Sequence, residues 1–365
     1  MFSLASRSLH PFRVLAVESS ADDTCAAIVD ASRRIWSNVV VKQHHLHEKA
    51  GGIHPVVAMR AHQRNMPAAV RQALVDASLD ISDVDGIAFT RGPGLPGCLS
   101  VACNAAKTLA AVHNKPIVGV HHMQAHALTV NLASSSPPQF PCLTLLVSGG
   151  HTLILLATSL VDFRILATTV DKSIGSAIDR VVTLLQIKWT ELGPGAALEA
   201  YCAEPVPDGE GPTYDPAIPM PGRLAFSFSG LHSFVERTIA AAGGVDYVNK
   251  RALARAFQSA AFAQIESKLR LALKWCERND HPVRRIVVSG GVASNSLLRQ
   301  RLKSSLAGVD SMELIYPEPA LCTDNAVMIA WASMHRFLAH DHDNYEIGPL
   351  PEWSIEDLQR PPDRA

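Results

Sequence analysis

Residues 84–112 read VDGIAFTRGPGLPGCLSVACNAAKTLAAV and carry three successive signals that decide the fold class. Residues 84–90 are mostly apolar and predict a strand. Residues 91–97 contain three glycines and two prolines and predict a tight loop. Residues 99–112 predict a helix. A strand, a loop and a helix in this order favour an α/β fold.

The alternation of elements continues upstream of this stretch. Residues 13–17 and 25–29 predict two strands, joined by a turn at residues 18–24 that is rich in acids and hydroxyls. Such a turn could hold a phosphate or a metal-bound water, or it could be a plain polar hairpin turn. Residues 60–78 predict an amphipathic helix, which Pro67 is expected to kink.

Downstream, the pattern restarts after a linker that is predicted at residues 134–138, Ser-Ser-Ser-Pro-Pro. Strands are predicted over residues 143–147, 152–157 and 286–289. Helices are predicted over residues 251–277, from Ser294 onward, and over residues 324–333 with Thr323 as the N-cap. The expected division of the chain is a leader at residues 1–12, an N-terminal lobe at 13–133, a C-terminal lobe at 142–330 and a tail at 331–365.

The composition is that of a globular protein, with 365 residues, 47% hydrophobic and 18% charged residues. At roughly 100–200 residues per domain, this length allows two domains. Because the net charge is only −1, a nucleic-acid partner must be bound by local basic patches. The candidates, each equally consistent with a solvated helix face, are Arg60, Arg64, Arg299, Arg301 and Lys303. No apolar run approaches the ~20 residues needed to cross a membrane.

The N-terminal residues and the cysteines bear on the cellular compartment. Residues 1–17 contain two arginines and three serines but no acid, which is typical of a mitochondrial import leader. An ordinary frayed terminus is the alternative. The seven cysteines are scattered and include no Cys-x-x-Cys pair, which favours a reducing compartment.

Two histidines four residues apart form the first candidate site. On a helix, His122 and His126 would share a face and could bind one ion. Neutral imidazole is a common ligand for zinc and iron. Asp324, expected at a helix start, is the candidate third ligand, and three ligands would leave coordination positions open for a substrate. The chain has 16 histidines, so the pair alone could also be structural or incidental.

Glycine turns that follow two apolar strands, at Gly149-Gly150 and Gly290-Gly291, form the second candidate site. Glycine lets a backbone approach a ligand closely and offers N–H groups to a phosphate. Carboxylate and amide side chains near these turns could bind a ribose or a base. The candidate nucleotide-binding residues are Leu146, Val147, Ser148, Gly149, Gly150, Asp179, Gly195, Glu199 and Asn295. Each turn taken singly could equally be a tight strand–helix connection.

Seven motifs, taken in order, resemble those of the tRNA N6-adenosine threonylcarbamoyltransferase family. Together they extend from about residue 14 to about residue 330. They are VESSADDT (17–24), RGPGL (91–95), HMQAH (122–126), LVSGGHT (146–152), FSFSGL (226–231), SGGVASN (289–295) and CTDNA (322–326).

This resemblance implies an actin/Hsp70/sugar-kinase-like (ASKHA) fold, with two lobes around a central cleft. It implies transfer of a threonylcarbamoyl group from threonylcarbamoyl-adenylate to N6 of adenosine 37, in tRNAs that read codons starting with A. It assigns one divalent ion, iron or zinc, to His122, His126 and Asp324, and the adenylate to the nucleotide-binding residues named above. With its acid-free leader, the chain resembles the mitochondrial branch, whose members can act as homodimers without partner subunits.

The chain departs from the family pattern at several positions. Ala21 stands where a cysteine is common, Ser176 replaces an acid, and residues 188–193 differ from the usual form before Gly195 and Glu199. His232 replaces a lysine, and the loss of an ammonium group is expected to weaken an anion or tRNA contact. The general base is not evident from these motifs. Its candidates are Asp22, Asp23 and His151.

Three other functions remain open on the residues alone. A metallopeptidase would also use two histidines and an acid to bind zinc, although the chain lacks the His-Glu-x-x-His motif. An ATPase or sugar kinase of the same fold would act on ATP without tRNA, since a fold does not determine a function. A non-catalytic scaffold would bind a nucleotide without a metal.

Overall fold

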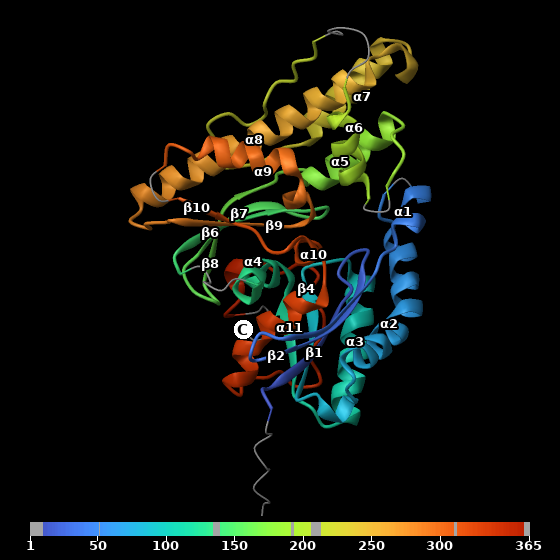
Figure 1. The fold of residues 1–365 in the computed structure, drawn as a ribbon, viewed down its shortest axis with the longest axis vertical. Helices are drawn as coiled ribbons and strands as arrows, with labels where there is room; N and C mark the ends of the chain where they lie inside the picture. Colours follow the sequence, from blue (N-terminus) through green and yellow to red (C-terminus); the bar gives the residue numbers. More distant parts are fainter. Residues whose placement is uncertain are drawn as a thin grey trace, which may run out of the picture. The chain divides into compact units, whose positions relative to one another are not determined.

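A computed structural model describes the chain over residues 10–50, 52–133, 139–190, 193–205, 213–309 and 312–360 (Figure 1). These residues form two units. The N-terminal unit contains residues 10–43, 53–133 and 324–354, and the C-terminal unit contains residues 44–50, 52, 139–323 and 355–360, with the gaps given above. The predicted linker at 134–138 and most of the predicted leader lie outside the described residues.

The N-terminal unit is built on a five-stranded mixed sheet with the strand order β3-β2-β1-β4-β5. Its first three strands are antiparallel neighbours, whereas β4 runs parallel to β1 and β5 runs parallel to β4. The central strands are buried on both faces, as expected for strands covered by helices. The strands are β1 (Arg13–Glu18), β2 (Thr24–Asp30), β3 (Ile35–Val41), β4 (Gly86–Gly92) and β5 (Ile117–His121).

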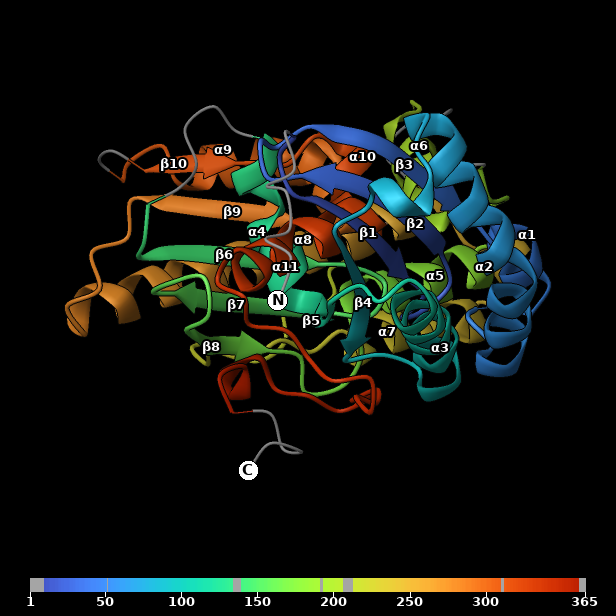
Figure 2. The ribbon, with the colours of Figure 1, turned by 90° about the horizontal axis from the view of Figure 1, so that it is seen from below.

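Helices cover both faces of this sheet. Side chains of α2 and α3 pack with Leu15 and Val17 of β1 in one buried cluster, and α11 lies on the opposite side of the strands (Figures 1 and 2). Pro67 lies inside α2 without ending it, because α2 continues for ten further residues, to Ala77. The helices are α2 (Pro55–Ala77), α3 (Pro96–Val112), α4 (His122–Ala133) and α11 (Ala326–Leu338), with a 3-10 turn, η1 (Ile81–Asp83).

The C-terminal unit repeats the same sheet topology. Its strand order is β10-β9-β6-β7-β8, with antiparallel pairs at β6–β7 and β7–β8 and parallel pairs at β6–β9 and β9–β10. The restart that the sequence pattern predicts is therefore present in the fold. The strands are β6 (Cys142–Val147), β7 (Thr152–Ala157), β8 (Phe163–Thr168), β9 (Arg285–Ser289) and β10 (Glu313–Ile315).

The core of the C-terminal unit joins Leu143, Leu145 and Val147 of β6 to apolar side chains of the helices. The long helix α8 lies along one face of the sheet (Figure 1). The helices are α1 (His44–Ala50), α5 (Ile174–Leu184), α6 (Pro194–Ala203), α7 (Ser229–Ala241), α8 (Lys250–Arg278), α9 (Ser296–Ser305) and α10 (Pro319–Cys322). The 3-10 turns are η2 (Val245–Tyr247), η3 (Gly291–Ser294) and η4 (Ile355–Asp357).

The expected boundary between a lobe at 142–330 and a tail at 331–365 differs from the observed one. Residues 324–354 pack with the N-terminal unit. α11 contacts the strands of that unit, and the segment after it is bound to β5, where the Asp343 amide donates to the carbonyl of Ile117 at 2.8 Å. Local sequence patterns do not predict such long-range pairing, so they do not predict that the chain returns to its first sheet.

The structure also bears on the cysteines and on membrane crossing. All seven cysteines are buried and none forms a disulfide. Among the described residues, no helix combines the length and the apolar character that a membrane crossing requires.

Candidate functional site

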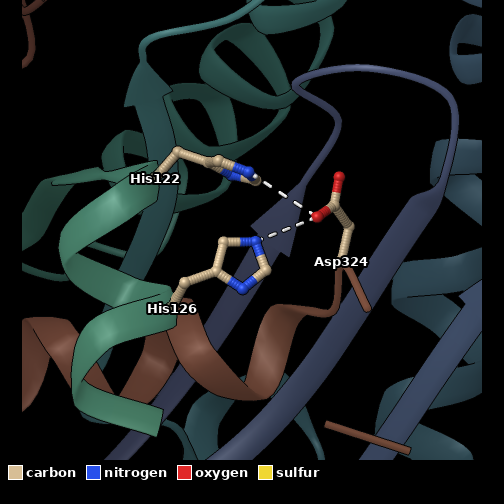
Figure 3. A group of neighbouring side chains, drawn as sticks. All are labelled: His122, His126 and Asp324. Atoms are coloured by element: carbon tan, nitrogen blue, oxygen red, sulfur yellow. Dashed lines mark hydrogen bonds and ion pairs between the residues drawn. The ribbon is translucent and has the colours of Figure 1, made fainter. Parts of the chain in front are cut away.

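The two histidines lie on one face of one helix, as their spacing predicts. α4 begins directly after β5, so His122 is its first residue and His126 follows about one turn later. The centroids of the two rings are 4.7 Å apart and the ring planes are nearly perpendicular, at 85°. Both rings point toward the same space (Figure 3).

Asp324 faces this pair, although it lies 198 positions after His126 in the chain (Figure 3). Its Oδ1 atom is 3.0 Å from Nε2 of His126 and 3.6 Å from Nε2 of His122. The expectation that Thr323 caps the last helix is wrong. Asn325 is the N-cap of α11, because its side chain accepts a hydrogen bond from the amide of Met328 at 2.9 Å.

The three side chains suit a divalent ion. Their donor atoms lie within 4.8 Å of one another. Both imidazoles are almost fully buried, and the Asp324 side chain is 21% exposed, which would keep one side of an ion accessible. Two imidazoles and a carboxylate are ligands for zinc or iron and leave coordination positions open.

A fully buried carboxylate, that of Glu18, contacts Nδ1 of His122. Oε2 of Glu18, at the end of β1, is 3.2 Å from Nδ1 of His122. Burial acts to raise the pKa of Glu18, but the His122 charge and hydrogen bond outweigh it and lower that pKa. Burial acts to lower the pKa of His122, but the charges of Asp324 and Glu18 raise it to about 9. Acidic groups therefore dominate around the rings, which favours a cation.

Two further acids, both predicted as general-base candidates, lie in the turn after β1. Burial and the charge of Asp324 raise the pKa of Asp22 to about 6. Burial and the charges of Asp22 and Asp324 raise the pKa of Asp23 well above its usual value. A carboxylate with a pKa near neutrality suits proton exchange, so Asp22 is the stronger of these two candidates. The third, His151, belongs to the C-terminal unit.

A buried histidine that the sequence reasoning missed holds this acidic turn in place. His62 of α2 is fully buried, and its Nε2 is 3.0 Å from the carbonyl oxygen of Ala21. Its Nδ1 is 2.8 Å from the hydroxyl of Thr24 and 3.2 Å from the amide nitrogen of Gln43. Burial lowers the pKa of His62, which favours the neutral ring. In the sequence, the only signal for this residue is its position on the apolar face of a predicted helix, which indicates burial.

In the C-terminal unit, the two glycine turns lie side by side. Gly149-Gly150 follows β6 and Gly290-Gly291 follows β9, and these strands are parallel neighbours with Leu146 opposite Ser289. Ligands of α/β sheets bind beyond the carboxyl ends of such strands. Gly149 and Gly150 are exposed, and a side chain added at either would meet nothing within 4 Å. Their backbone is therefore accessible to a ligand.

The remaining nucleotide candidates lie on the helices around these turns. The first turn of α5 packs on Ser148 and Gly149, and Asp179 lies farther along the same helix. A Cβ atom at Gly175 would lie 2.6 Å from the carbonyl oxygen of Ser148, so glycine is required there. On α6, Glu199 accepts hydrogen bonds from the Ser296 amide, at 2.7 Å, and from the Ser296 hydroxyl.

Asn295 is adjacent to that contact. Its side-chain oxygen caps α9 by accepting from the amide of Leu298 at 3.0 Å. A side chain added at Gly195, on the first turn of α6, would meet nothing within 4 Å. The structure thus brings Glu199 next to Asn295, and the glycine turns next to α5, within one unit.

The basic candidates differ in their surroundings. Arg301 forms a paired contact with Glu266, at 2.5 and 3.2 Å, and Arg299 stacks on Tyr316 and donates to the carbonyl of Ala293. Arg299 and Arg301 thus have internal partners, whereas Arg60 and Arg64 of α2 are both exposed.

His232, which replaces a lysine, is 8% exposed and lies on α7. Burial and the nearby charges of Lys172 and Arg180 lower its pKa, which favours the neutral ring. The predicted weakening of an anion or tRNA contact at this position stays a prediction.

Comparison with known proteins identifies relatives over most of the chain. The family model described as tRNA N6-adenosine threonylcarbamoyltransferase matches residues 34–331. The chain is 36% identical to the mitochondrial tRNA N6-adenosine threonylcarbamoyltransferase of Schizosaccharomyces pombe over 370 residues, which cover 96% of this chain and 88% of that protein.

Solved structures with low sequence identity share the fold. HypF of T. kodakarensis matches with a TM-score of 0.54 and 13% identity, over 94% of this chain and 50% of that chain. Component A of the (R)-2-hydroxyglutaryl-CoA dehydratase of Acidaminococcus fermentans matches with a TM-score of 0.52 and 12% identity, over 89% of this chain and 98% of that chain. These likenesses show the fold alone, which is the ASKHA fold expected from the motifs.

Proposed function

Because the chain belongs to the tRNA N6-adenosine threonylcarbamoyltransferase family, we propose that it transfers a threonylcarbamoyl group from threonylcarbamoyl-adenylate to N6 of adenosine 37. The acceptors are tRNAs that read codons starting with A. The observation that carries the proposal is the convergence of His122, His126 and Asp324 from two distant segments on one point.

We assign one divalent ion, iron or zinc, to these three residues. When bound, the ion supplies a Lewis acid for the acyl end of the donor. In the reaction, the N6 amine forms a bond to the carbamoyl carbon, the bond from that carbon to the phosphate oxygen breaks, and AMP leaves with the electron pair. The amine must also lose a proton, and Asp22 is the candidate acceptor. Since an aromatic amine is a weak nucleophile, orientation of the two substrates contributes much of the rate.

We assign the nucleotide end of the donor to the C-terminal unit. The exposed backbone at Gly149-Gly150 offers N–H groups to the phosphate. The carboxylates of Asp179 and Glu199 suit the ribose hydroxyls, and Asn295 suits the base or the ribose, since it is fixed by its capping bond. Leu146, Val147, Ser148 and Gly195 complete the set through their backbone.

We further propose that the protein acts in mitochondria as a homodimer and binds tRNA through local basic residues. The mitochondrial assignment is supported by the acid-free residues 1–17 and by the name of the yeast relative. For tRNA phosphates, Arg60, Arg64 and Lys303 are better candidates than Arg299 and Arg301, whose guanidinium groups have internal partners.

The test is transfer from threonylcarbamoyl-adenylate to an unmodified tRNA by the purified protein alone, supplied in turn with Fe²⁺ and Zn²⁺. Asp324→Ala is compared with Asp246→Ala, a matched control whose carboxylate is 81% exposed and paired with Lys250 at 3.0 Å. We expect equal transfer by the parent and by Asp246→Ala, and at least a hundredfold less by Asp324→Ala. A tRNA with guanosine at position 37 should accept nothing.

Each contrary result has a defined meaning. Transfer that is unchanged in Asp324→Ala would show that the metal assignment is wrong. Hydrolysis of ATP or of peptides in the absence of tRNA, with no transfer by the parent, would favour one of the alternative activities over the proposed one.

A further inference from the structure

Glu18 is a buried carboxylate that contacts a proposed metal ligand without being one. Its side chain is fully buried at the end of β1. Its Oε2 atom is 3.2 Å from Nδ1 of His122, while the other nitrogen of that ring, Nε2, is 3.6 Å from Oδ1 of Asp324. The imidazole thus lies between two carboxylates and presents a different nitrogen to each.

The orientation of the Glu18 carboxylate is set by groups other than His122. The backbone amide of Ser20 donates to Oε1, and the hydroxyl of Thr90 donates to Oε2. Ser20 and Thr90 belong to the turn after β1 and to the neighbouring strand β4, and both are buried. A buried charge is tolerated where such donors compensate for its lost hydration. Ser20 and Thr90 therefore fix the orientation of the Glu18 carboxylate independently of His122.

This arrangement selects one form of the imidazole. An ionised carboxylate only accepts hydrogen bonds, so the nitrogen facing Glu18 must carry a proton. A neutral His122 then has its proton on Nδ1 and its lone pair on Nε2, toward Asp324. The hydroxyl of Ser20, 3.3 Å from Nδ1, can accept from the same nitrogen. Outer carboxylates of this kind orient ligand histidines and raise their basicity.

We infer that Glu18 is a positioning residue, which holds His122 in the Nδ1–H form with Nε2 available to the metal. The inference rests on the proposed metal centre. His126 provides a contrast within the same site, because its Nδ1 is buried without a hydrogen-bond partner among the described residues. Among the described residues, a carboxylate thus contacts Nδ1 of His122 but not Nδ1 of His126.

The test is the dissociation constant for Zn²⁺, measured on metal-free protein by competition with a chelator, for the parent and for Glu18→Gln. The amide group cannot satisfy both neighbours. An NH2 group at the Oε1 position would oppose the Ser20 amide, and an NH2 group at the Oε2 position would donate to His122 and move its proton to Nε2. We expect Glu18→Gln to weaken Zn²⁺ binding about 10- to 100-fold. In the Zn²⁺-loaded parent, we expect ¹⁵N spectra of histidine-labelled protein to show the proton of His122 on Nδ1, and a proton on Nε2 would overturn the inference.

Two further variants separate this role from a merely structural one. Asp30→Asn is the matched control, because Asp30 is a buried carboxylate of the same sheet that accepts hydrogen bonds from Ser32 and Trp36 and none from His122. Its Zn²⁺ affinity should equal that of the parent. Glu18→Asp keeps the charge with one methylene less, should weaken binding by a smaller factor than Glu18→Gln, and decides the matter if Glu18→Gln fails to fold.

The outcomes are distinct. Zn²⁺ binding by Glu18→Gln within twofold of the parent, or weakening of the same size in Asp30→Asn, would overturn the inference and leave the metal centre intact. A parent protein that binds no Zn²⁺ or Fe²⁺ would overturn the proposed metal centre itself.

Discussion

Replacement of Asp343 by alanine should destabilise the N-terminal unit, because this residue ties the C-terminal segment to the strand that leads into α4. The Asp343 side chain is 2% exposed. Its Oδ2 accepts from the backbone amide of Gly119 on β5 at 2.8 Å. Both oxygens also pair with the guanidinium of Arg336 on α11, at 3.0 and 3.1 Å.

The expected loss of stability follows from these contacts. A buried amide left without an acceptor, here that of Gly119, costs about 1–3 kcal/mol, and a hydrogen bond to a charged group contributes about 1.5–3 kcal/mol. The larger cost of an orphaned buried charge does not apply in full, because Arg336 keeps its bonds to Asp341, at 2.8 and 3.1 Å. We therefore expect Asp343→Ala to lower the free energy of unfolding by about 3 kcal/mol.

The assay is urea denaturation together with hydrogen exchange of the Gly119 amide. Asp341→Ala is the matched control, since it removes a carboxylate from the same arginine but at a side chain that is 55% exposed. Its cost should be about 0–1 kcal/mol, as for an exposed ion pair. Exchange at Gly119 should accelerate only in Asp343→Ala. Equal destabilisation by the two variants, or unchanged exchange at Gly119, would refute the reasoning.

Three further outcomes follow from other contacts. Gly92→Ala should destabilise the protein by about 1–3 kcal/mol in thermal denaturation, because its Cβ would lie 1.7 Å from the carbonyl oxygen of Leu350, whereas Gly348→Ala meets nothing within 4 Å and should be neutral. His62→Leu leaves the carbonyl of Ala21 in the acidic turn without its donor and should cost about 1–3 kcal/mol in urea denaturation, and a cost near zero would show that His62 does not hold this turn in place. Burial acts to raise the pKa of Asp171, but hydrogen bonds at the start of α7 lower it, so its stabilisation should be present above pH ~4 and fall away as the pH drops through the lowered pKa. Asp171→Ala should therefore cost about 1 kcal/mol at pH 7 and less at pH 2, and a pH-independent difference in the free energy of unfolding would exclude this account.

The local elements were accessible from the sequence because their signals are short-ranged. The strand, loop and helix predicted over residues 84–112 correspond to β4, the loop after it and α3, with boundaries shifted by no more than three residues. Helix periodicity likewise placed His122 and His126 on one face. The errors lie at element ends, where one capping side chain decides the start of a helix, as Asn325 does for α11 instead of Thr323.

The arrangement around the metal candidates depended on contacts that no local pattern contains. The sequence named Asp324 as the candidate third ligand without its position in space, and the packing of residues 324–354 on the first sheet brings it within 3.0 Å of His126. In the same way, Glu18 appeared as one acid of a polar turn, and its contact with His122 across 104 positions emerged only in the fold.

By itself, then, the sequence determined the α/β class, the repeated order of elements and the histidine pair on one helix, since these depend on periodicity and turn chemistry over a few residues. The tertiary structure alone decided that Glu18 meets that pair, which unit receives the last part of the chain, and which histidine, His62, holds the acidic turn. The reason is physical, because these contacts arise when distant segments bury their apolar faces together, and burial of a whole face is not encoded at any single position.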